Sequence, residues 1–121
     1  AGAEVEVDAP LGRPPLFVRV GAALVLAGRE IPLVRPHDAP ARTLYVVPGK
    51  ASGSGASAHF EDDGESWSLA SGDHFAGRIA VAWDGAGIRI SAERQSGRRP
   101  LELAGFTVES PTAGGRAISI K

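Results

Sequence analysis

The chain has 121 residues, 43% of them apolar, and a net charge of −1 at pH 7. This length fits one domain, or one domain with an attached piece of another. The near-neutral charge excludes nucleic acid and anionic membranes as partners attracted by a general electrostatic field. No stretch approaches the roughly 20 apolar residues of a membrane-spanning helix, and no basic head with an apolar signal core opens the chain. We therefore expect a soluble protein, with the cytoplasm favoured and the compartment otherwise open.

Two residue types are missing. Without cysteine the chain has no disulfides and no thiolate chemistry. Without methionine, either an initiator Met was removed ahead of Ala1 or the chain belongs to a longer polypeptide, and the second interpretation is favoured by the resemblance described below.

Apolar residues alternate with polar ones in many short stretches, which is typical of half-buried strands. No apolar pattern of helical period lasts three turns, and 16 Gly and nine Pro interrupt the chain. The expected strands, in chain order, are 5–7, 16–20, 22–26, 44–47, 65–69, 78–83, 88–92, 101–103, 106–108 and 118–120.

The segments between these strands are predicted to be loops. Residues 33–42 contain Pro36 and Pro40 and indicate a linker or a long loop, while the small polar residues 50–57 indicate a flexible loop. A tight turn is expected at Asp63-Gly64. A bulge at Ala104-Gly105 would reconcile the opposite parity of the strands on either side of it.

The clearest hairpin joins residues 78–83 to residues 88–92. Its turn contains Asp84-Gly85, a pair that supplies the positive backbone angles of a tight hairpin. Trp83 lies on the apolar face of the first strand, so we expect it in the core. About ten short strands and no substantial helix predict an all-β fold, an antiparallel β-sandwich of jelly-roll type.

Three segments together resemble a known family. They are Ala9–Ala22 (Ala-Pro-Leu-Gly-Arg-Pro-Pro-Leu-Phe-Val-Arg-Val-Gly-Ala), Leu44–Gly49 (Leu-Tyr-Val-Val-Pro-Gly) and Phe60–Ser66 (Phe-Glu-Asp-Asp-Gly-Glu-Ser), the last followed by Gly72. In this order and spacing they resemble the C-terminal region of glycoside hydrolase family 31, the α-glucosidase and α-xylosidase family. The resemblance is specific over residues 5–72, weaker over 73–94, and architectural beyond. It departs at Phe60, where the family usually has Tyr, and at residues 50–57, which look elongated.

The resemblance implies two pieces of chain. Residues 1–40 would be strands from the end of a proximal sandwich domain plus a linker, and residues 41–121 a distal sandwich domain. In that family a (β/α)₈ barrel carries the catalytic aspartates of a retaining glycosidase, so none of them is expected in this chain. We therefore expect a non-catalytic structural module, without cofactor, whose partners are the barrel and the proximal sandwich of a parent enzyme.

The acidic run is the first candidate for chemistry. Crowded carboxylates on a glycine-containing turn suit calcium, and the candidate ligands are Glu61, Asp62, Asp63 and Glu65. The favoured interpretation is a tight turn in which Asp62 or Asp63 accepts hydrogen bonds from backbone N–H groups. Neighbouring carboxylates on one turn cannot face each other across a glycosidic bond, so they are not a catalytic pair.

The histidines do not form a metal motif. His37, His59 and His74 have no pair at ligand spacing, which argues against zinc. His59 and Asp62 could meet on one loop, but a solvated histidine is the favoured interpretation. Arg94, Arg98 and Arg99 form a small basic patch that we interpret as a solvated loop.

Carbohydrate binding is the alternative function. Sandwich modules stack apolar sugar faces on exposed aromatic rings, and Trp67 beside the acidic turn 61–65 is the candidate platform; otherwise Trp67 packs in the interior. Homodimerisation is also predicted, because strands within 5–34 whose partner strands are missing would either fold onto the distal module or pair with a second copy.

Overall fold

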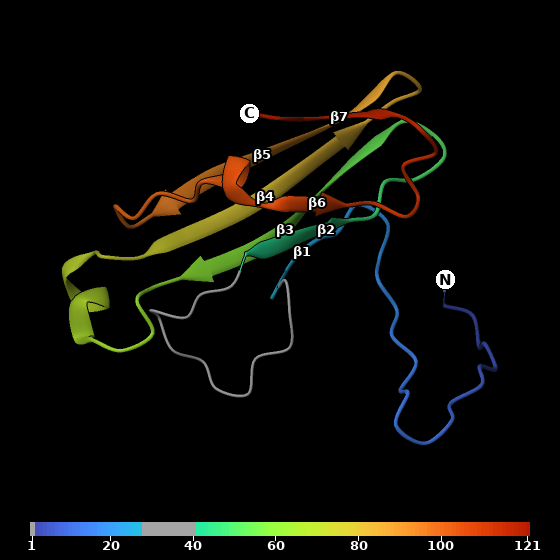
Figure 1. Ribbon diagram of the computed structural model, residues 1–121, viewed down its shortest axis with the longest axis horizontal. Helices are drawn as coiled ribbons and strands as arrows, with labels where there is room; N and C mark the ends of the chain where they lie inside the picture. The colour runs from blue at the N-terminus through green and yellow to red at the C-terminus, as the bar shows by residue number, and fades with distance from the viewer. Residues whose placement is uncertain (1, 28–40) are drawn as a thin grey trace.

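The computed structural model describes residues 2–27 and 41–121 (Figure 1). Within these ranges the chain forms two sheets and two short 3₁₀ helices. The three-stranded sheet has the spatial order β1 (Ala23–Ala27), β2 (Arg42–Val46) and β6 (Thr107–Glu109). The four-stranded sheet has the order β3 (Gly53–Glu61), β4 (Phe75–Trp83), β5 (Gly87–Ser96) and β7 (Ala117–Ile120). The 3₁₀ helices are η2 (Trp67–Ser71) and η3 (Leu103–Gly105).

The core lies between the two sheets. Along β4, every second residue from Phe75 to Trp83 is buried, and the intervening residues face outward. This period of two is the pattern of a sheet with one buried face. The buried cluster joins side chains of both sheets and of the segment around η3: Ala23, Leu44, Val46, Ile79, Val81, Trp83, Ile88, Ile90, Leu103 and Phe106. The all-β sandwich prediction is confirmed.

The predicted number of strands is wrong: the described residues contain seven, not about ten. Residues 5–7 and 16–20 have the alternation of strands but form none, because no other strand lies beside them to supply hydrogen bonds. All side chains from residue 2 to residue 20 are exposed, and this segment runs away from the sheets (blue in Figure 1). Strand 22–26 is confirmed as β1, which pairs with β2 over its whole length.

The loop predicted at residues 50–57 is also wrong. Residues from Gly53 onward belong to β3, which pairs with β4 from Gly53↔Trp83 to Glu61↔Phe75. The small residues serve close packing. A Cβ on Gly55 would lie 2.5 Å from the carbonyl oxygen of Gly21, and one on Gly53 would lie 2.8 Å from the Trp83 ring. Small residues here allow the backbone of β3 to lie close to the backbone of Gly21 and to the Trp83 ring. Composition alone does not distinguish this packing role from that of a flexible loop.

Two further irregular segments differ from prediction. Residues 65–69 were expected as a strand, but Trp67–Ser71 forms η2, because Ser66 caps its first turn and Gly72 (φ 90°) ends it in the left-handed region. The parity change near Ala104-Gly105 is produced by η3 instead of a bulge. Of the predicted loop 33–42, residues 33–40 lie outside the described residues, and Arg42 already belongs to β2.

The hairpin of β4 and β5 is confirmed and is longer than predicted, reaching from Phe75 to Ser96. Its turn differs in mechanism, because neither Asp84 nor Gly85 has a positive φ. The Asp84 carboxylate instead accepts hydrogen bonds from the N–H groups of Ala86 (2.8 Å) and Gly87 (2.9 Å). Hydrogen bonds to the Asp84 side chain thus hold this turn, without the positive backbone angles that were expected of the Asp-Gly pair.

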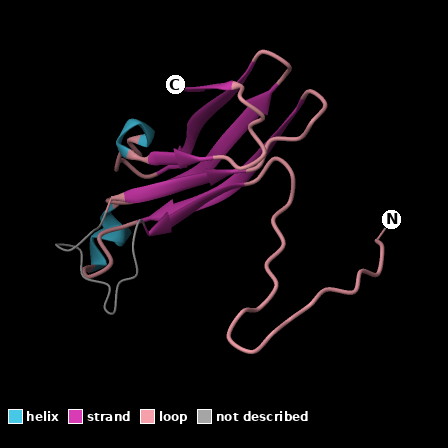
Figure 2. Cartoon of the chain, turned by 45° about the vertical axis from the view of Figure 1, so that its right-hand side comes forward, coloured by secondary structure: helices cyan, strands magenta, loops and turns pink. Residues whose placement is uncertain are grey.

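The strand pairing is only partly antiparallel. β6 lies parallel to β2, and β7 lies parallel to β5. Both strands come from the last fifth of the chain and add to the edges of sheets that are already formed by antiparallel neighbours (Figure 2). The final strand predicted at 118–120 is confirmed as β7. The division of the chain near residue 40 stays a prediction, while β1 belongs to the same sheet as β2 and β6.

Candidate functional site

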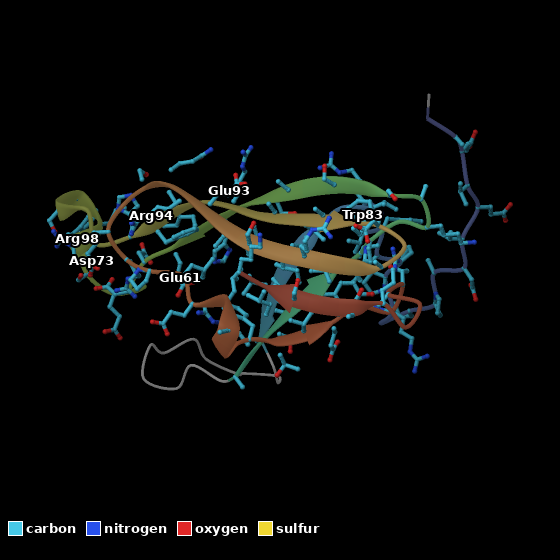
Figure 3. All side chains as sticks on the ribbon, turned by 90° about the horizontal axis from the view of Figure 1, so that it is seen from above. Glu61, Asp73, Trp83, Glu93, Arg94 and Arg98 are labelled. Atoms are coloured by element: carbon cyan, nitrogen blue, oxygen red, sulfur yellow. The ribbon has the colours of Figure 1, made fainter. Side chains whose placement is uncertain are left out.

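Polar and aromatic side chains gather at one end of the sandwich, where β3 ends, η2 follows and the loop after β5 returns. We call this the η2 corner (residues 60–74 and 97–99). In Figure 1 it lies at the left, at the yellow-green coil of η2, and the N-terminal segment lies at the right. In Figure 3, Asp73 and Arg98 lie together at this end, and Trp83 lies toward the other.

Asp63 organises the turn before η2. One carboxylate oxygen accepts from the N–H groups of Glu65 (3.1 Å) and Ser66 (3.0 Å), and the other accepts from the hydroxyls of Ser66 and Ser68. The hydrogen bond from the Ser66 hydroxyl contributes most to lowering the pKa of Asp63 far below its ordinary value, and the two backbone N–H groups add to it. Asp62 accepts from the N–H of Gly64 at 2.9 Å. The interpretation of the acidic run as a tight turn is confirmed.

A second carboxylate ties η2 to the loop after β5. Asp73 accepts hydrogen bonds from Ser68 (3.2 Å) and Arg99 (3.3 Å). The hydrogen bond from Arg99 is the main reason that the pKa of Asp73 is lowered. The backbone continues this link, since the N–H of Arg98 donates to the carbonyl of Gly72 at 2.9 Å. Of the basic patch predicted as a solvated loop, Arg98 and Arg99 are thus hydrogen-bonded to residues around η2, whereas Arg94 belongs to β5 and donates to the carbonyl of Arg98 at 3.3 Å.

Glu61 has a different environment from the rest of the acidic run. It pairs with Arg42 of β2 at 2.7 Å and lies 3.3 Å from the imidazole Nε2 of His59. Burial raises the pKa of Glu61, but the hydrogen bonds and charges of Arg42 and His59 outweigh it and leave the pKa lowered. The Arg42 guanidinium also stacks over Phe106, 4.5 Å from the ring centroid. This cluster links the two sheets.

His59 therefore contacts Glu61 and not Asp62. It is a residue of β3, and its ring also lies 6.1 Å from that of Phe75. His37 lies outside the described residues. Among the residues that are described, no three His, Asp or Glu side chains are grouped so that they could hold one metal ion. The four carboxylates of the acidic run instead lie in separate interactions or face solvent; they belong to Glu61, Asp62, Asp63 and Glu65.

The two tryptophans differ sharply in exposure. Trp83 is 5% exposed and donates from its indole N–H to the carbonyl of Ala51 at 2.6 Å, which confirms the prediction that it belongs to the core. Trp67 is 90% exposed. A ring of this size left in water is unusual, because its burial would remove a large apolar area from solvent.

A second exposed aromatic ring lies in the η2 corner. Phe60, on the outward face of β3, is 53% exposed and stacks on His74, with centroids 5.8 Å apart and an interplanar angle of 24°. His74 is also 3.3 Å from the hydroxyl of Ser96. Neither this stack nor the Asp73–Arg99 pair is among the features predicted from the sequence. The sequence contains one indication of the stack. Along β3 the side chains alternate between the two faces, and Phe60 falls on the outward face.

A shallow groove of about 570 Å³ lies on the outer face of the four-stranded sheet, away from the η2 corner. Its floor consists of small residues such as Ser54, Ala56 and Ala80. Of its charged side chains, Arg78 pairs with Glu93 inside the groove, and Arg89 pairs with Asp84 outside it. It contains no aromatic ring, so it offers less to a ligand than the η2 corner.

Comparison with known proteins adds no assignment: no family model, no curated protein and no solved structure matches the chain. In the described ranges, no helix combines the length and apolar character needed to cross a membrane.

Proposed function

We propose that this chain is a non-catalytic structural module of a larger enzyme, an α-glycosidase of the kind that glycoside hydrolase family 31 contains. The observation that carries the proposal is the segment 2–20. All of its side chains are exposed, including Leu16 (86%) and Phe17 (74%). Seven large apolar side chains are exposed along it: Val5, Val7, Leu11, Leu16, Phe17, Val18 and Val20.

In water, this extended segment gains no stability from burial of its apolar side chains. Between residues 2 and 18 the described hydrogen bonds amount to one backbone turn, from the N–H of Arg13 to the carbonyl of Pro10 at 3.0 Å. Exposed apolar patches and unpaired strand backbone mark sites of contact with other protein. The segment therefore fits a strand or tether that is buried against a neighbouring domain, while the sandwich supplies the rigid body behind it.

The arrangement of polar groups supports a role without bond breaking. The carboxylates of Glu61, Asp63 and Asp73 are occupied by cations, hydroxyls or backbone N–H groups of the chain itself. Their pKa values are lowered, whereas a general acid needs a pKa raised toward neutrality. These groups serve the local structure of the η2 corner.

Two objects test the proposal: the gene that encodes the chain, and the longer protein to which we propose that the chain belongs. We expect the coding sequence ahead of residue 1 to specify a (β/α)₈ barrel with catalytic aspartates. We expect the longer protein, and not the 121-residue chain, to hydrolyse an aryl α-glucoside or α-xyloside. We expect limited proteolysis to cut within residues 2–20 in the isolated chain, while the same bonds resist cleavage in the longer protein.

Two results would overturn the proposal. Hydrolysis by the isolated chain would contradict a non-catalytic role. Equally rapid cleavage of residues 2–20 in both proteins would show that no neighbouring domain covers this segment.

A further inference from the structure

We propose that the η2 corner is a surface binding site for a neutral oligosaccharide, with the Trp67 ring as its stacking platform. This site is independent of the packing role proposed above, because η2 and the N-terminal segment lie at opposite ends of the structure (Figure 1). The sugars that we expect it to bind are pyranoses of the gluco or xylo configuration. Their equatorial hydroxyls leave an apolar ring face of C–H groups.

The exposure of Trp67 is the starting point. With 90% of its surface in water, both faces of the indole are open to a flat apolar partner. Aromatic rings gain from contact with such surfaces beyond simple area burial. A pyranose ring face has the size and flatness of such a partner, and its hydroxyl rim remains hydrated.

Hydrogen bonds hold the backbone of the turn that presents Trp67. Ser66 caps η2, and Asp63 is held by the two residues before Trp67 and by Ser68 after it. Asp73 then connects Ser68 to Arg99. A backbone fixed in this way loses little conformational freedom when a ligand binds the ring that it presents, which is one way in which preorganised sites gain affinity.

Phe60 offers a second contact in the same corner. It precedes Trp67 by seven residues, its ring is supported from one side by His74, and 53% of its surface is exposed. Two exposed rings in one corner of the sandwich suit a chain of sugars better than a single ring does.

The η2 corner also contains charged side chains that lie outside the described ion pairs. Asp62, Glu65 and Arg98 belong to the η2 corner, and none of them forms an ion pair with another described residue. Their carboxylates and guanidinium can exchange hydrogen bonds with sugar hydroxyls. Both signs of charge are present, so the corner favours a neutral polyhydroxylated ligand over a strongly charged one.

The experiment uses the isolated 121-residue chain and its tryptophan fluorescence. Maltohexaose and xylohexaose are titrated in parallel, and calorimetry follows the stronger of the two. We expect one of them to produce a saturable change in the emission of the exposed tryptophan, with a Kd on the order of 1 mM, as befits a small, open site.

Variants assign the signal to the site. Trp67→Ala is expected to weaken binding measured by calorimetry about tenfold, which corresponds to about 1.4 kcal/mol, while Trp67→Phe restores part of the loss. Phe60→Ala is expected to have a smaller effect in the same direction. Leu11→Ala, at a fully exposed position in the N-terminal segment, is the matched control and should bind as the unsubstituted chain does.

Two outcomes would overturn the proposal. The first is the absence of saturable binding of both oligosaccharides in both measurements, with a chain that far-ultraviolet circular dichroism shows to be folded; the exposed ring would then serve protein contact. Alternatively, binding of equal strength in Trp67→Ala would place the sugar elsewhere. Neither outcome bears on the coverage of residues 2–20, so failure here is distinguishable from failure of the packing role.

Discussion

The surroundings of Trp83 and of Trp67 show two opposite uses of the same side chain. Around Trp83 the chain places glycines, and a Cβ on Gly21, Gly49 or Gly53 would lie 2.8–3.4 Å from atoms of the indole. Backbone can therefore close over the ring and bury it. Around Trp67 the chain places Asp, Ser and Glu, whose hydrogen bonds fix the turn but cannot cover an apolar surface.

This contrast teaches that neighbours, and not the apolar character of a residue, decide its burial. Hydrophobicity alone would bury both tryptophans. Only Trp83 has residues in the facing strand small enough to admit it. An aromatic ring that the fold leaves exposed is then available for contact with a ligand or with another protein.

The largest expected effect comes from removing Trp83. We expect Trp83→Ala to lower the free energy of unfolding by about 3–5 kcal/mol, because it leaves a cavity and frees the carbonyl of Ala51 from its hydrogen bond. Trp67→Ala is expected to change it by less than about 0.5 kcal/mol. Urea denaturation measures both, and Trp83→Phe serves if the alanine variant does not fold. Similar losses for the two tryptophans would contradict the contrast.

Gly55→Ala should have the next largest effect. The added methyl group would collide with the backbone of Gly21, since its Cβ would lie 2.5 Å from a carbonyl oxygen. We expect a loss of about 1–3 kcal/mol, measured by urea denaturation. Gly85→Ala is the matched control, because a Cβ there meets nothing within 4 Å. If both variants are equally stable, residues 50–57 are as tolerant as the predicted loop would have been.

Much of the fold could be predicted from residue patterns, and the failures have a common cause. The hairpin of β4 and β5 follows from alternation around Asp84, and the turn at Asp63-Gly64 from local chemistry. Residues 16–20 have equally good alternation, but a strand needs a hydrogen-bonding neighbour, which local sequence does not reveal. Residues 53–57 look like a loop because the reason for their small size lies in Gly21 and Trp83, distant in sequence.

The candidate site was predicted in part for the same reason. Trp67 and the acidic turn are adjacent in sequence, so they could be identified together. The stack of Phe60 on His74 and the pair of Asp73 with Arg99 depend on how β3, β4 and the loop after β5 meet. Their separations in sequence, 14 and 26 residues, place them beyond any short motif.

The ion pair that links the sheets at the η2 corner should make stability depend on acid pH. The folded-state pKa of Glu61 is lowered, so its stabilisation is present above the unfolded value of about 4.3 and is lost as pH falls through the folded value. We expect Glu61→Gln to cost about 0.5–1 kcal/mol at pH 7. The difference from the unsubstituted chain should shrink below about pH 4, measured as Tm against pH. A difference that stays constant to pH 3 would assign the effect to packing.

The smallest effect on stability is expected at the N-terminal end. Deleting residues 2–18 should change the free energy of unfolding by less than about 0.5 kcal/mol, because these side chains bury nothing. Its effect on association should be clear. Without a neighbouring domain, the full chain is expected to self-associate with rising concentration through this segment, and the shortened chain to stay monomeric by light scattering. A full chain that is monomeric at all concentrations would contradict the predicted homodimer.

The amino-acid sequence by itself determined the class of the fold, the central hairpin and the turn at Asp63-Gly64 that precedes Trp67, because alternation and turn chemistry act over a few residues. The tertiary structure alone decided which alternating stretches became strands, which small residues were needed for close approach, and which tryptophan stayed in water. The physical reason is that a strand's hydrogen bonds and a side chain's burial both depend on whatever lies across from them, and that partner comes from a distant part of the chain.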